Sequence, residues 1–100
     1  MKTEIRPRGI TLTKPQRTRL EHHLGLVFAR FGDRIDRVIV RLSNAAEAGL
    51  KHCELEVQCP SQLVKVEHSD TDVFLALEHA ANRAARSVIR AIETEDLARR

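Results

Sequence analysis

The sequence contains no tryptophan and no tyrosine, and only three phenylalanines. Single-strand readers of the RRM or OB type stack bases on exposed aromatic side chains, so this composition argues against both classes. No apolar run approaches the roughly 20 residues that a membrane-spanning helix needs, and the N-terminal stretch lacks the apolar core of a signal peptide. We therefore expect a cytoplasmic protein without a membrane partner.

Cysteine is also scarce, with only Cys53 and Cys59 in the chain. If both lie on one strand, they are about 20 Å apart, which is far beyond disulfide reach. We expect two reduced core residues. Short motifs for metal, nucleotide or nucleophilic chemistry are missing as well: no HExxH, CxxC, GxGxxG, P-loop or nucleophile elbow occurs. The histidines, which show no metal-ligand spacing with either cysteine, are His22, His23, His52, His68 and His79.

These absences predict a protein that is not an enzyme, holds no metal or cofactor and has no small-molecule substrate.

What the sequence does contain is positive charge. The formal net charge is +3, but residues 1–41 carry ten Lys or Arg against four Asp or Glu, a net of +6, so residues 42–100 carry −3. Most of the basic residues are arginine, whose forked guanidinium suits bidentate contact with phosphate. A polyanionic partner is therefore a reasonable hypothesis.

The hydrophobic periodicity predicts six elements. Residues 3–7 and 9–13 form a first extended segment, interrupted by Pro7 and Gly9. Thr13 is a good N-cap and Pro15 fits the first turn of a helix over 14–31, which Gly32 then ends. Alternating stretches predict strands at 36–43, 51–59 and 63–69. A second helix follows over 72–92, fraying toward 98 and capped by Asp72 or Asp70.

This order, β-α-β-β-β-α, predicts the α+β class. We expect a two-layer sandwich in which both helices cover one face of a four-stranded sheet. The chain shows no linker or repeat, so we expect one domain over residues 1–100, with a core at about 3–92 and a tail at 93–100.

A positively charged stripe follows the second predicted helix. At 100° per residue, His79, Arg83, Arg86 and Arg90 fall together, opposite a core face that includes Leu77. A solvated outer face is the ordinary explanation, but such faces usually mix both charges, and no acid belongs to this stripe. The small residues beside the stripe, which would leave room for a close partner, are Ala76, Ala80, Asn82 and Ala85.

The first predicted helix carries a similar flank. Arg19, His23, Leu26 and Arg30 recur at helical spacing, and Arg8 lies in the first extended segment together with Arg6. With both helices on one sheet face, these groups would join the second helix in one basic surface. Unrelated surface charges are the alternative. The other sheet face should be explained by cross-strand ion pairs.

The segment "IRPRGITLTKPQRTRLEHHL" resembles the opening of the ribosome hibernation-promoting factor / ribosome-associated inhibitor (sigma-54 modulation protein) family. "FGDRIDRVIVRLS" is similar to that family's passage into the second strand, and "DTDVFLALEHAANRAARSVIR" to its second helix, with Phe74 at the aromatic position. The resemblance covers roughly residues 3–92 and is to a short, diverged form without a second domain. The matching positions in the first segment are Ile5, Arg8, Ile10, Thr13, Arg17, Glu21 and Leu24.

The resemblance implies the same β-α-β-β-β-α fold, similar in topology to double-stranded-RNA-binding domains. It also implies binding to small-subunit rRNA near the mRNA and tRNA channel, and translation inhibition under stress or in stationary phase. A monomer is expected, with weak self-association as the alternative. The residues expected to contact rRNA are Arg83, Arg86, Arg90, Arg8, Arg19, Arg30, His23 and His79.

Three stretches depart from the family pattern: Pro7-Arg8-Gly9, His22-His23 and the acidic segment at 93–96. They motivate an alternative function, a protein–protein interaction module on the same scaffold with weakened RNA binding. Leu26 and Ile89, which we expect to be exposed, and the acidic tail support this alternative, whose target would be an acidic protein or a second copy of the chain.

Overall fold

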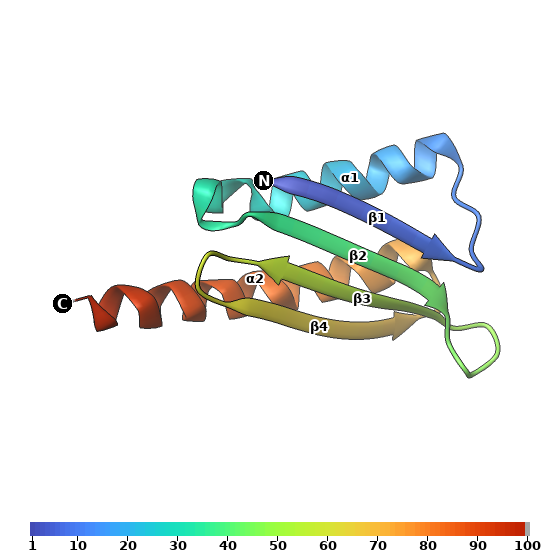
Figure 1. The fold of residues 1–100 in the computed structure, drawn as a ribbon. Helices are drawn as coiled ribbons and strands as arrows, with labels where there is room; N and C mark the ends of the chain where they lie inside the picture. The colour runs from blue at the N-terminus through green and yellow to red at the C-terminus, as the bar shows by residue number, and fades with distance from the viewer. Residues whose placement is uncertain (100) are drawn as a thin grey trace.

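The computed structural model describes residues 1–99 and contains the predicted order of elements (Figure 1). One short 3-10 helix, η1, follows the first α-helix. The elements are β1 (Lys2–Arg8), α1 (Lys14–Phe28), η1 (Ala29–Arg34), β2 (Arg37–Asn44), β3 (Lys51–Gln58), β4 (Leu63–Asp70) and α2 (Val73–Ala98).

The four strands form one sheet in the order β1-β2-β3-β4. β1 pairs parallel with β2, whereas the β2–β3 and β3–β4 pairs are antiparallel. The predicted alternation is confirmed, because Val40 lies opposite Ile5 on one side and Leu55 on the other, and all three are buried. Pro7 is tolerated within β1 because an edge strand does not need every backbone N–H for pairing.

Both helices cover the same face of the sheet, which confirms the predicted two-layer sandwich (Figure 1). α2 packs on β3 and β4, and α1 packs beside it, over β1. Ala76, Ala80 and Ala85 of α2 are buried, so the expectation that they flank the stripe as open space is wrong. Their small side chains instead let α2 approach its neighbours closely.

The helix ends follow local capping chemistry. The Thr13 hydroxyl accepts from the backbone N–H of Gln16, whose side chain accepts from the Thr13 N–H, a complete capping box. Asp72 caps α2 by accepting from the N–H groups of Phe74 and Leu75. Thr13 and Asp72 are therefore confirmed as N-caps.

The boundaries of both helices differ from the prediction. α1 ends at Phe28, and the chain turns through η1 to Gly32, whose φ of 54° few other residues adopt. α2 continues as far as Ala98, so the predicted tail is helical over 93–98. The extension is held by ion pairs from Arg34 of η1 to Asp96 and Glu95, at 3.1 and 3.9 Å. Residue 100 of the predicted tail lies outside the described residues. No helix within residues 1–99 is long and apolar enough to cross a membrane.

Candidate nucleic-acid interface

The arginines divide into two groups by their partners. Several have a carboxylate within 4.0 Å and lie on the outer sheet face or at the ends of elements: Arg6, Arg34, Arg37, Arg41 and Arg99. Among the described residues, none of the six arginines predicted to contact rRNA has such a carboxylate partner. The predicted arginines therefore keep a charge that no carboxylate of the described fold neutralises.

A groove between α1 and α2 brings two of the predicted residues together. Arg30 of η1, just beyond the end of α1, and Arg86 of α2 both line it, and both are exposed. The other lining residues are Leu26, Val27, Asn82 and Ala85. Two residues of the basic surface predicted across the two helices, Arg30 and Arg86, therefore lie along one groove.

Arg83 and Arg90 lie on the opposite flank of α2, toward β4. The Arg83 guanidinium donates to the main-chain carbonyl of Glu67 at 2.8 Å. Arg90 donates to the Ser87 hydroxyl at 3.3 Å and lines a hollow beside β4. The stripe therefore runs along α2, with Arg86 facing α1 and the other two arginines facing the sheet edge.

The α1 flank is only partly available at the surface. Arg19 is exposed, and its guanidinium stacks on the ring of Phe74 from α2. His23 is half-buried with its ring edge-on to Phe74, 5.4 Å between centroids. Its Nε2 atom is buried and has no hydrogen-bond partner. This nitrogen is therefore not at the surface where it could contact rRNA.

Arg8 does not join the surface of the helices. It lines a hollow with Arg41 and Glu54, which form an ion pair across the outer sheet face at 3.4 Å. The reason is the pleat of β1: Ile5 points into the core, so residues an odd number of positions away point outward. The predicted placement of Arg8 beside the second helix is wrong.

The acidic end of α2 is mostly occupied by ion pairs of its own. Glu95 pairs with Arg99 at 2.7 Å, and Asp96 with Arg34 at 3.1 Å. Glu93 is exposed one turn beyond Arg90 and has no ion pair within the described chain. Among the described acids at this end of α2, Glu93 is therefore the one without an ion pair, and it lies one turn from Arg90.

The outer sheet face carries the expected cross-strand ion pairs. Glu56 lies between Arg41 and Lys65, at 3.4 and 3.9 Å. A hydrogen bond from the Gln58 amide, followed by the Arg41 contact, lowers the pKa of Glu56 below its ordinary value. Most charges described on this face are paired with one another, with Arg8 an exception, whereas the arginines predicted on the surface of the helices have no described carboxylate partner.

The two cysteines are free, and Cys53 belongs to the core as predicted. Burial raises the pKa of the Cys53 thiol to about 12, so it stays protonated at neutral pH. Cys59 is only half-buried.

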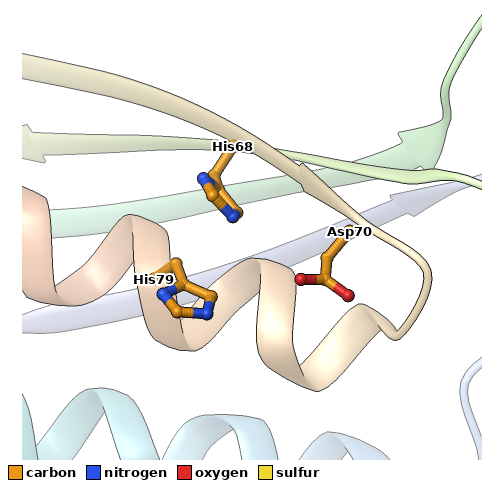
Figure 2. A group of neighbouring side chains, drawn as sticks. All are labelled: His68, Asp70 and His79. Atoms are coloured by element: carbon orange, nitrogen blue, oxygen red, sulfur yellow. The ribbon is translucent and has the colours of Figure 1, made fainter.

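His79 has neighbours that the sequence analysis did not identify. His68 and Asp70 of β4 lie beside it, and Figure 2 shows the three side chains converging between the strand and α2. The alternation of β4 was an available signal, because it places His68 and Asp70 on the same inward face as Val64. These three side chains are the group in the described chain that could hold a metal ion.

The chain matches a known protein family over most of its length. The family, described as "Sigma 54 modulation protein / S30EA ribosomal protein", matches residues 3–94. The solved N-terminal domain of Protein Y from Thermus thermophilus is 28% identical with a TM-score of 0.75, over 90% of this chain and 98% of that one. No protein with a curated function matches the chain.

A second solved structure shows the same fold. A ribosomal subunit interface protein from Coxiella burnetii superposes with a TM-score of 0.80 at 13% identity, over 93% of this chain and 99% of that one. Its four-stranded sheet with two helices agrees with the architecture described above. By its family match, this chain belongs to the ribosome-associated sigma 54 modulation protein / S30EA ribosomal protein family.

Proposed function

We propose that this protein binds the rRNA of the small ribosomal subunit near the mRNA and tRNA channel. In doing so it holds ribosomes inactive under stress or in stationary phase. Membership of a ribosome-associated family supports this proposal. So does the likeness to a Coxiella burnetii protein named for the ribosomal subunit interface.

The observation that carries the proposal is the distribution of unpaired charge. Arg30 and Arg86 line one groove, Arg83 and Arg90 the other flank of α2, and no carboxylate of the described residues lies within 4.0 Å of them. Arginines on a rigid layer of helices neutralise phosphates and read the shape of a folded RNA rather than its sequence. This role needs no chemical step, cofactor or small-molecule substrate.

Two further features complete the proposal. Residues 1–100 act as one domain, and the protein binds as a monomer, because each contact proposed above comes from a single copy. Ribosome association would also place the protein in the cytoplasm.

The test is co-sedimentation with purified small subunits over a range of salt concentrations. Each phosphate contact contributes about −0.7 to −0.9 to the slope of log K against log salt. A variant with Arg83, Arg86 and Arg90 all changed to Ala should therefore lose about 2 to 3 from the magnitude of that slope. Its binding should fall most at low salt.

A matched control removes the same charge elsewhere. Changing Arg6, Arg37 and Arg99 to Ala deletes three arginines that are paired with carboxylates, so binding should change much less. Equal losses in both triple variants would contradict the assignment of the stripe. No association of the unaltered protein at low salt would contradict rRNA binding itself.

One observation favours the protein-interaction alternative. Leu26 is 68% exposed at the rim of the groove between the helices, although Ile89 is half-buried rather than exposed. Recovery of partners from lysate before and after nuclease treatment separates the two functions. An rRNA-mediated complex is lost after nuclease treatment, whereas a protein complex anchored at Leu26 survives nuclease and is lost in Leu26→Asp.

A further inference from the structure

Three potential metal ligands meet where β4 passes into α2. His68 and Asp70 come from the last residues of β4, and His79 lies two turns into α2 (Figure 2). One ligand atom from each residue lies within 4.8 Å of the other two. The two imidazole rings are 4.8 Å apart between centroids, with an interplanar angle of 41°.

The local fold explains why these residues converge. His68 and Asp70 are two residues apart on a strand, so their side chains point to the same side of the sheet, toward α2. A tight connection through Thr71 and the cap residue Asp72 then starts the helix, which returns along β4 and brings His79 over the strand. The backbone of the strand and the helix therefore already brings the three residues together, and only their side chains need to adjust.

The carboxylate is already oriented by its neighbours. Oδ1 of Asp70 accepts from the backbone N–H of Asp72 and from the Thr71 hydroxyl, both at 3.3 Å. These bonds leave the second oxygen available. Hydrogen bonds of this kind fix the ligating carboxylate in known metal sites.

The three side chains do not satisfy one another. Within residues 1–99, no hydrogen bond joins His68, Asp70 and His79, although all three point into one space. A structural histidine–aspartate pair would be expected to form such a bond. Two imidazoles and a carboxylate are also the ligand types that zinc takes in sites with an open coordination position.

We propose that His68, Asp70 and His79 form a binding site for one Zn²⁺ ion. Ligand atoms about 2.0–2.1 Å from a tetrahedral zinc are about 3.3 Å from each other. The ligand atoms of His68, Asp70 and His79, now up to 4.8 Å apart, therefore need to move closer together. Rotation of the exposed His79 side chain provides that freedom. The fourth position faces solvent and takes water.

Arg83 is a positively charged residue that opposes cation binding at this site. It lies one helical turn beyond His79, and its guanidinium is held by the Glu67 carbonyl at 2.8 Å, next to His68 in sequence. A fixed positive charge there weakens cation binding. Arg83→Ala is therefore expected to bind zinc at least as tightly as the unaltered protein while binding ribosomes less tightly. This opposite response makes the zinc site and the proposed rRNA function separable.

The experiment is calorimetric titration of ZnCl₂ into the full 100-residue chain, purified without a histidine tag and treated with chelator. One ion per chain is expected. His79→Gln and His68→Gln should each weaken zinc binding at least about tenfold, because losing even a group that supports a ligand weakens metal affinity by about that much. His22→Gln is the matched control, because His22 is exposed on α1 away from the cluster and its loss should leave Kd unchanged.

Two further measurements keep the result unambiguous. Cobalt substitution should give visible absorption without thiolate charge transfer, and Cys59→Ser should leave it unaltered. Saturating zinc should raise the Tm of the unaltered protein by roughly 5–10 °C, and this shift should disappear in His79→Gln. The absence of one-to-one binding would overturn the proposal. Binding that survives both His68→Gln and His79→Gln would overturn it as well.

Discussion

The guanidinium carbon of Arg19 lies 3.7 Å from the centroid of the Phe74 ring, a contact that joins the second turn of α1 to the first turn of α2. Stacking on the ring fixes the direction of the guanidinium and leaves its N–H groups at the surface. An arginine held in this way loses less side-chain entropy when it meets a phosphate. Phe74 thus acts on the proposed interface through Arg19.

Phe74→Leu should weaken binding to small subunits about two- to fivefold, because an exposed cation–π contact is worth about 0.5–1 kcal/mol. Leucine retains an apolar side chain at this half-buried position. The measurement is a double-mutant cycle with Arg19→Ala, using subunit affinity as the readout and a melting curve to confirm folding. If Phe74→Leu weakens binding equally in the Arg19→Ala background, the ring acts by another route.

Glu93 is the acid whose removal should strengthen ribosome binding. It is exposed one turn from Arg90 and has no described ion pair, so Glu93→Gln removes a repulsive charge from the phosphate path. We expect about two- to threefold tighter binding at low salt, vanishing as the Debye length shrinks toward about 3 Å near 1 M salt.

Glu95→Gln is the matched control for this effect. It makes the same change in net charge, but Glu95 already pairs with Arg99 at 2.7 Å and lies near Arg34. Its removal should leave ribosome affinity almost unchanged. Equal strengthening by both variants would mean that total charge, rather than the position of Glu93, controls association.

The sequence was sufficient to predict the order of elements and the buried face of each strand. The alternation of residues 36–43 places Val38, Val40 and Leu42 on one side of the strand, and the helical period places Val88 on the same face as Leu77; all five are fully buried. These patterns succeed because each reports contact with one large surface, the sheet or the helix layer.

The same period could not describe α2 completely, because α2 contacts two surfaces. One side of α2 is buried against the sheet, and a further side, which includes Ala85, is buried against α1. A helical wheel that assumes a single contact surface places Ala85 on the exposed side. The burial of His23 follows from the same contact. The meeting of His68 with His79 depends on how tightly the chain turns through Thr71 and Asp72, and periodicity within one element carries no information about that turn.

His23→Phe should stabilise the fold. The Nε2 atom of His23 is buried without a hydrogen-bond partner, and an unsatisfied polar atom costs about 1–3 kcal/mol. Phenylalanine keeps the ring contact with Phe74 and removes that cost. We expect the free energy of unfolding to rise by about 1 kcal/mol and Tm by about 4–8 °C, measured by thermal melting. His22→Phe, on the exposed side, should give no such gain, and lower stability in His23→Phe would show that its nitrogen is satisfied in solution.

Glu56 should make the stability of the fold sensitive to acid. The Gln58 amide, then Arg41 and Lys65, hold the pKa of Glu56 below its ordinary value of 4.5. A carboxylate with a lowered pKa in the folded state contributes stability that is complete above the unfolded value and is lost as pH falls through the folded one. Chemical denaturation from pH 7 to pH 3 should therefore show a decline in the free energy of unfolding that begins near pH 4.5.

In Glu56→Gln this decline should be shallower. Glu47→Gln, in the loop between β2 and β3, is the control and should keep the profile of the unaltered protein. Superimposable profiles for Glu56→Gln and the unaltered protein would exclude the ion-pair cluster around Glu56 as a source of acid sensitivity.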